Sequence, residues 1–130
     1  MSGMIIFRTH PKNVSAVLKH AKHALRGRPQ GLEPGDLILI SELVTECADE
    51  NPVKYAMEFV RCYEDLDGES ARLWGNQWRY IIVGRNARAL KTPFNIKQHQ
   101  ATTTNYGQGG AWVHVAAEDA SVLVNRGLLG

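Results

Sequence analysis

Long apolar runs are missing from this 130-residue sequence. No segment approaches the roughly 20 apolar residues that a membrane-spanning helix needs. The opening MSGMIIFRTHPK has neither the long apolar stretch nor the small-residue cleavage site of a secretory signal. We therefore expect a soluble, cytoplasmic protein without a membrane partner. The length and the 44% hydrophobic content predict one domain over residues 1–130.

Cysteine and the common catalytic motifs are also scarce. Cys47 and Cys62 show no C-x-x-C spacing, which argues against a disulfide framework and a cysteine-ligated zinc site. The sequence has no G-x-S-x-G motif and no Walker loop, and GQGG at 107–110 lacks the context of a phosphate cradle. His20 and His23 lie three residues apart without a third ligand, so we assign them to the exposed face of a helix. The sequence thus predicts no metal, no cofactor and no catalytic nucleophile.

The net charge of +2 is unevenly distributed. Residues 1–32 hold six Lys or Arg and no acid, residues 33–69 hold eleven acids and two bases, and residues 70–130 hold seven bases and two acids. The two basic segments could form one positive face that attracts a polyanion, or solvated faces of both signs. The positive face would contain Lys22, Arg26, Arg28, Lys91 and Lys97 and the residues predicted to contact phosphate, which are Arg8, Lys12, Lys19, Arg79, Arg85 and Arg88.

The first half of the chain predicts a strand, a helix and two further strands. MIIFRT at 4–9 is rich in strand-forming residues. Apolar residues at helical spacing then predict a helix over 12–26 with a basic outer face. LILIS at 37–41 is typical of a short buried strand. A loop at 46–52 precedes VKYAMEFVRCYED at 53–65, whose alternation predicts a long, half-exposed strand.

The second half continues with strands and ends in a helix. WRYIIVG at 78–84 predicts a strand, and KTPFNI at 91–96 predicts a separate docking segment. The uncharged stretch at 98–110 is a loop by composition, AWVHVA at 111–116 is a strand, and 117–125 is a short helix. This order favours an α+β fold in which a mixed sheet of five or six strands curls into a small barrel.

Several motifs in this order resemble a known family. GDLILIS follows a basic helix, and a long strand, WRYIIVG, LKTP, a Gly-containing loop and AEDASVL come after it. Over nearly the whole chain this arrangement resembles the EVE domains of the PUA-like superfamily, which are related to YTH and ASCH domains. GNQW and Trp112 depart from the family pattern. The resemblance implies a mixed β-pseudobarrel with flanking helices, whose open mouth accepts a nucleobase, often a modified one, between aromatic walls.

Two of the three tryptophans stand four positions apart in LWGNQW. Trp74 has Gly75 and Asn76 beside it, which favours a pocket, while Trp78 heads a strand and is either core or pocket. We expect Trp74 to line a concave site next to Ser41 and the loop at 105–108, with Trp78 anchoring the segment in the barrel. The residues predicted to contact a base are Ser41, Glu42, Trp74, Asn76, Trp78, Asn105 and Tyr106, of which Ser41 and Glu42 match positions where the family places polar pocket residues.

Three functions stay open at this point. The first is a module that binds nucleic acid, RNA or DNA, and recognises a nucleobase, expected to be a modified one, in an aromatic-walled pocket at the barrel mouth. The second is a small ASCH-type hydrolase acting on a nucleoside-like substrate, for which Lys54, Glu58 and Thr104 are of suitable types if they converge. The third is a protein-interaction domain. The sequence leaves the oligomeric state open.

Overall fold

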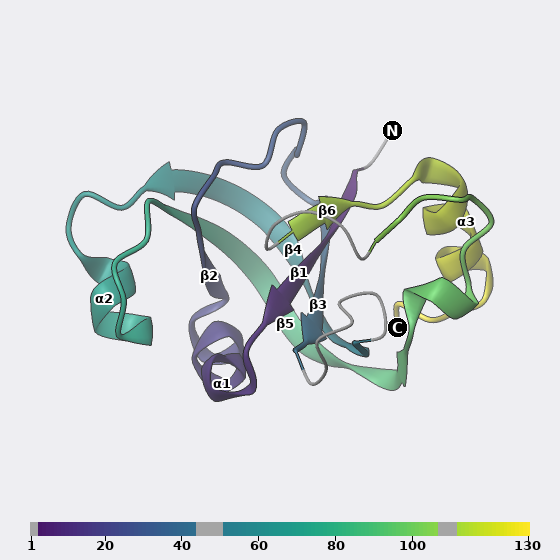
Figure 1. Cartoon of the computed structure of the whole chain (residues 1–130), viewed down its shortest axis with the longest axis horizontal. Helices are drawn as coiled ribbons and strands as arrows, with labels where there is room; N and C mark the ends of the chain where they lie inside the picture. Colours follow the sequence, from purple (N-terminus) through teal and green to yellow (C-terminus); the bar gives the residue numbers. More distant parts are fainter. Residues whose placement is uncertain (1–2, 44–50, 107–111) are drawn as a thin grey trace.

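The computed structural model describes residues 3–43, 51–106 and 112–130. These residues form a mixed six-stranded sheet in the order β2-β5-β4-β3-β1-β6, together with three α-helices. The sheet curls into a half-barrel, and Figure 1 shows its two long strands, β4 (Val53–Glu64) and β5 (Tyr80–Phe94), curving across the molecule. The expected α+β class with a mixed, curled sheet is therefore confirmed.

The centre of the sheet is built from short apolar strands. β1 (Met4–Thr9) pairs in parallel with β3 (Leu37–Glu42), so that Ile5 lies beside Ile38 and Phe7 beside Ile40. Parallel neighbours need a crossover connection, and the segment between β1 and β3 supplies it. β6 (Trp112–His114) pairs antiparallel with the other side of β1.

The helix expected over 12–26 is shorter and is followed by a strand. α1 (Pro11–His20) begins with His10 as its N-cap and ends at Ala21, whose φ of 52° lies in the left-handed region. Residues Lys22–Leu25 then form β2, which pairs antiparallel with β5. This pairing satisfies the backbone of β2 and buries its side chains from His23 to Leu25, which explains why helical spacing did not decide its structure.

The segment between β4 and the end of β5 also differs from expectation. α2 (Glu69–Trp74) was not predicted, and β5 continues without a break to Phe94, which includes most of the docking segment expected at 91–96. A short 3-10 helix, η2 (Ile96–Gln98), follows β5.

Other expected elements are found close to their predicted bounds. The long strand at 53–65 is β4, and the final helix at 117–125 is α3 (Ala117–Asn125). The loops expected at 46–52 and 98–110 lie partly outside the described residues. No helix of the described residues combines the length and the apolar character that crossing a membrane requires.

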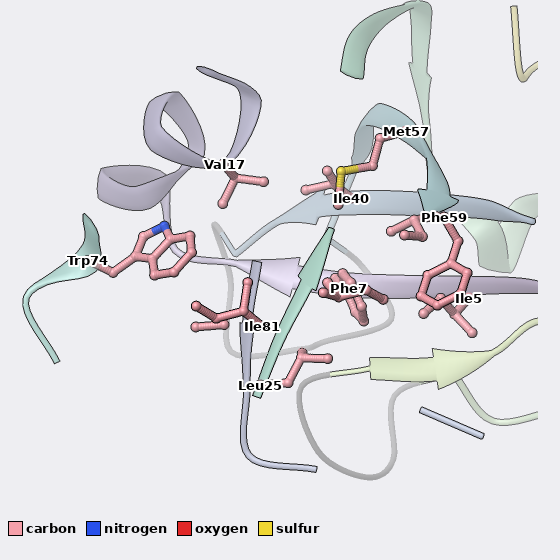
Figure 2. Packing of buried hydrophobic residues seen from close by; sticks show 12 residues of the cluster. Ile5, Phe7, Val17, Leu25, Ile40, Met57, Phe59, Trp74 and Ile81 are labelled. Carbon is pink, nitrogen blue, oxygen red and sulfur yellow. The ribbon is translucent and has the colours of Figure 1, made fainter. Parts of the chain in front are cut away.

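Alternation along β1 divides the buried side chains into two clusters. Ile5 and Phe7 belong to the first, which α1 and Trp74 of α2 cover, and Figure 2 shows part of its packing. Met4 and Ile6 belong to the second, together with Leu123 of α3. In Figure 1, α1 and α2 lie toward one end of the molecule and α3 lies at the other.

Candidate functional site

A cavity of about 210 Å³ opens where β1 ends and α1 begins. The end of α2 and the residues that follow it close the cavity from the opposite side, so both tryptophans of LWGNQW reach it. Its lining residues are Arg8, Thr9, His10, Asn13, Val17, His23, Ala24, Leu43, Trp74 and Trp78.

Two indole rings wall this cavity. Trp74, the last residue of α2, is 9% exposed and packs into the first core cluster, while Trp78 is half-buried. The guanidinium carbon of Arg26 lies 5.5 Å from the ring centroid of Trp78, within the range of a cation–π contact. Both rings line the cavity, as expected for Trp74, and Trp78 packs against the core from its partly exposed position. Trp74 is the more buried of the two, because it belongs to the core cluster itself.

The indole N–H of Trp74 is a buried donor. Nε1 makes no hydrogen bond to any of the described residues. Figure 2 shows this nitrogen on the side of the ring that faces α1, where Val17 also lies. A buried donor left unsatisfied costs about 1–3 kcal/mol.

Thr9 and His23 form a second polar element of the wall. Thr9 Oγ1 lies 2.8 Å from Nε2 of His23, and Nδ1 of His23 lies 2.9 Å from the carbonyl oxygen of Ala24. Burial lowers the pKa of His23 to about 4, while the backbone contact at Ala24 opposes this shift. His23 is therefore neutral near pH 7. The expectation that it lies on the exposed face of a helix is wrong, because residue 23 belongs to β2.

A network of hydrogen bonds fixes α2 and the segment that carries Trp78. Asp65 accepts from the backbone N–H groups of Glu69 and Ser70 at 3.0 and 2.8 Å. The hydroxyl of Ser70 donates to Asp65 and accepts from the backbone N–H of Trp78 at 2.9 Å. Burial would raise the pKa of Asp65, but the hydrogen bonds from Ser70, Glu69 and Gln77 outweigh it and hold the pKa well below its usual range.

A titratable cluster binds α2 to the sheet. Lys22 Nζ lies 2.5 Å from Oε2 of Glu69, and the Tyr63 hydroxyl donates to the other carboxylate oxygen. The hydrogen bond from Lys22 and then the one from Tyr63 lower the pKa of Glu69, while the bond to Glu69 raises the pKa of Lys22. The cluster thus links β2, β4 and α2, and holds the helix whose last residue is Trp74.

A second, polar depression of about 500 Å³ adjoins the cavity. Trp78 lines both, so one ring separates them. Its other lining residues are Arg26, Asn76, Gln77 and Arg79. Arg79 also lies 3.6 Å from Glu64 across the surface. Two guanidinium groups therefore stand beside an aromatic cavity.

The residues predicted to contact a base fall into separate places. Trp74 and Trp78 share the cavity, and Asn76 lies in the adjoining depression. Ser41 and Tyr106 line a different void of about 10 Å³, and the buried Ser41 hydroxyl has no hydrogen-bond partner among the described residues. The cavity of Trp74 is thus not next to Ser41, although Arg8 lines both spaces.

The two remaining base-contact candidates also lie away from the cavity. Glu42 pairs with Lys54 at 3.5 Å, and Asn105 is exposed outside the cavity lining. Residues 107 and 108 of the expected loop lie outside the described residues.

The cations predicted to contact phosphate are distributed over more than one region. Arg8 lines the cavity and donates to the carbonyl oxygen of Tyr106, while Lys12 and Lys19 are exposed on α1. Arg85 pairs with Glu58 at 3.1 Å, and Arg88 donates to the carbonyl oxygen of Leu129. Arg79 lies in the depression beside Trp78 together with Arg26.

The residue types considered for hydrolysis each contact a different neighbour. Lys54 pairs with Glu42, Glu58 pairs with Arg85, and Thr104 accepts a hydrogen bond from Thr102. Across the described ranges, no group of three or more His, Cys, Asp and Glu side chains is arranged to hold a metal ion.

Sequence reasoning missed the polar lining of the cavity, namely Thr9, His10, Asn13 and His23. The available signal was His10, which precedes Pro11 and caps α1 through its side chain. Because an Ncap residue directly precedes the first turn of its helix, that cap marks where α1 begins, one residue after the end of β1.

No family model matches the sequence, and no curated protein matches it. Solved structures do match. An ASCH protein from Zymomonas mobilis is 11% identical with a TM-score of 0.64, and the match covers 94% of each chain. A hypothetical protein from Leishmania major is 15% identical with a TM-score of 0.60, covering 97% of this chain and 94% of the other. A Pseudomonas syringae protein is 16% identical with a TM-score of 0.57, covering 95% and 98%. The chain therefore has the fold of the Zymomonas mobilis ASCH protein, and the likeness does not single out the EVE domains that the sequence resembles.

Proposed function

We propose that this protein binds nucleic acid and receives one unstacked base in the cavity walled by Trp74 and Trp78. The observation that carries this proposal is that the indole rings of Trp74 and Trp78 wall one cavity. A base taken out of its stack needs aromatic faces to replace its stacking and hydrogen bonds at its edge. Fold alone does not assign function, so the proposal depends on this site.

The size of the cavity suits a single flat ring system. Its volume of about 210 Å³ is below the roughly 300 Å³ at the lower end for drug-sized ligands. Stacking of a base on aromatic side chains is worth about 1–3 kcal/mol. Trp78, which is half-buried and lies between the cavity and the depression, is the ring best placed to stack against an entering base.

The adjoining depression favours a nucleic-acid strand over a free base as the ligand. Arg26 and Arg79 lie there beside Trp78. A guanidinium binds phosphate in a planar, bidentate manner. With the base in the cavity, the sugar-phosphate backbone of the nucleic acid would pass over these two cations. The resulting phosphate contacts supply affinity that a free base lacks.

Binding is favoured over hydrolysis by the polar residues of the site. Thr9 and His23 have the contact distance of a nucleophile and its base. Burial lowers the pKa of His23 to about 4, however, which makes it a weak proton acceptor near pH 7. Thr9 is only 2% exposed. The pair therefore serves as a fixed polar wall for the cavity.

The test is the affinity of the protein for labelled single-stranded heptanucleotides of RNA and DNA, measured by fluorescence anisotropy. We expect an oligonucleotide with a central abasic site to bind roughly ten- to a hundredfold more weakly than its parent. Trp78→Ala should reduce this difference. Trp112→Ala is the matched control, because Trp112 lies on β6 and lines neither space. Equal binding of parent and abasic strands would refute the proposal.

A further inference from the structure

The pairing of β2 with β5 brings further cations close to the depression. Leu25, the last residue of β2, pairs with Tyr80, the first residue of β5. Because the two strands are antiparallel, the residues that follow Leu25 and those that precede Tyr80 leave the sheet at the same end. These two short segments carry Arg26, Arg28, Trp78 and Arg79.

Arg79 connects the depression with the ring of Tyr80. Arg79 lines the depression, and its guanidinium carbon also lies 5.3 Å from the ring centroid of Tyr80. The guanidinium carbon of Arg28 lies 5.2 Å from the same centroid. Both distances are within the range of a cation–π contact. One tyrosine ring therefore holds two guanidinium groups, one of which also belongs to the depression beside the cavity.

Both guanidinium groups on Tyr80 are accessible to a ligand. Arg28 and Arg79 are exposed, and none of the ion pairs among the described residues involves Arg28. A guanidinium stacks on a ring through its face and donates hydrogen bonds through its edge, so a contact with Tyr80 leaves donors for a phosphate. The contact also limits the motion of a long side chain, which reduces the entropy lost on binding.

We propose that Arg28 and Arg79, held over the ring of Tyr80, bind a further phosphate group of the same single strand. This inference rests on the proposed function, because the base in the cavity is what brings the strand to the depression. The backbone then leaves the cavity past Arg26 and Arg79 and continues to Arg28. The ligand is therefore a single strand of several nucleotides, and a free nucleotide reaches only part of the site.

An acid on the neighbouring strand competes with phosphate at this place. Glu64 pairs with Tyr80 in the register of β4 and β5, and its carboxylate lies 3.6 Å from Nε of Arg79. Glu64 and Arg79 are both exposed, and an exposed ion pair is weak, so a phosphate can displace the carboxylate. Removal of the charge on Glu64 should therefore strengthen binding.

The test measures, by fluorescence anisotropy over a series of salt concentrations, binding of whichever heptanucleotide, RNA or DNA, binds more tightly. Each phosphate contact on a single strand adds about 0.7 to the salt slope, which corresponds to roughly fivefold in affinity at 0.1 M salt relative to 1 M. We expect Arg28→Gln to lower the slope by about 0.7 and to weaken binding roughly fivefold at 0.1 M salt. Glu64→Gln should instead tighten binding roughly two- to fivefold.

Glu58 and Arg85 provide matched controls on the same two strands. They form an ion pair at 3.1 Å. Glu58 and Glu64 stand six positions apart in β4, which is roughly 20 Å along a strand, whereas exposed charges act over about 10 Å at 0.1 M salt. Arg85→Gln and Glu58→Gln change the net charge as the two test variants do. They should leave the affinity within about twofold.

Tyr80 provides a pair of variants that leaves every charge in place. Tyr80→Phe keeps a ring under the two guanidinium groups, and Tyr80→Leu removes it. We expect Tyr80→Phe to bind roughly two- to fivefold more tightly than Tyr80→Leu. Should Tyr80→Leu fail to fold by circular dichroism, Arg28→Gln and Glu64→Gln still decide, because both alter exposed side chains.

Three results would contradict this inference. Unchanged affinity and salt slope in Arg28→Gln, with an abasic strand that still binds more weakly than its parent, would overturn it and leave the proposed function standing. Equal losses in Arg28→Gln and Arg85→Gln would show that net charge alone sets the affinity, and would also overturn it. Equal affinity of the parent and abasic strands for the unaltered protein would overturn both.

Discussion

Thr9 Oγ1 lies 2.8 Å from Nε2 of His23, although the whole of α1 separates the two residues in the chain. Thr9 is the last residue of β1, and His23 is the second residue of β2. The hydrogen bond thus ties the strand before the helix to the strand after it. Both side chains are buried and both line the cavity, so the contact couples proton binding by His23 to the stability of the fold.

Stability should fall when the solution is acidified below neutral pH. The pKa of His23 is about 4 in the folded protein against an ordinary value of 6.5 in the unfolded chain, so the unfolded chain binds more protons between these values. The contribution of His23 to the free energy of unfolding is therefore complete above about pH 6.5. It decreases as the pH falls toward 4, by roughly 3 kcal/mol in total.

Urea unfolding at a series of pH values measures this change. His23→Gln should remove most of the slope between pH 6.5 and 4. An equal slope in the variant and the parent would show that other groups carry the pH dependence.

The two tryptophans should differ in their effect on stability. Trp74→Ala removes a ring that is 9% exposed and packs into the first core cluster, so we expect a loss of roughly 3–5 kcal/mol. Trp78→Ala should cost less, because that ring is half-buried. Thermal or urea unfolding compares the two variants. A Trp74→Ala protein as stable as the parent would contradict the packing described here.

Ser70 should affect both folding and binding through Trp78. Ser70→Ala removes the oxygen that accepts the backbone N–H of Trp78 and the hydroxyl that donates to Asp65. We expect a loss of about 1–3 kcal/mol for the groups left unsatisfied, together with weaker oligonucleotide binding. Ser121→Ala is the control, because Ser121 is exposed on α3 and should change stability by less than about 0.5 kcal/mol. Equal behaviour of the two variants would exclude this role of Ser70.

Salt dependence tests the cations beside Trp78. On single strands, the logarithm of the binding constant should fall by about 0.7 per decade of salt for each phosphate that is neutralised. Arg26→Gln and Arg79→Gln should each lower that slope by about this amount. Arg126→Gln, in an exposed residue after α3, should leave it unchanged. Unchanged slopes in the first two variants would reject the depression as a phosphate site.

Segments with a consistent local pattern can be predicted from the sequence. The apolar run of β1, the alternating β4 and the short α3 all lie near their expected bounds. β2 cannot be predicted in this way, because Val17, Ala21 and Ala24 keep helical spacing through the end of α1. The left-handed backbone at Ala21 and the pairing of His23 with Ile82 decide its structure, and that partner lies far along the chain.

The residues of the candidate site also differ in how far the sequence predicts them. Tryptophans next to Gly75 and Asn76 indicate an aromatic wall, and both rings do line one cavity. The residues opposite them depend on where α1 ends, so an error in that boundary hides Thr9 and His23 as neighbours. Ser41 is expected there from family resemblance, but it lines the separate void with Tyr106.

The most direct measurement of the central claim is the set of indole N–H signals in a proton–nitrogen correlation spectrum. The three tryptophans give three such signals, which Trp→Phe variants at positions 74, 78 and 112 assign. During titration with the best-binding heptanucleotide, we expect saturable shifts of the Trp74 and Trp78 signals, because both rings wall the cavity that receives the base, and little change for Trp112. Saturable binding that leaves the Trp74 signal unmoved would show that the base does not enter this cavity.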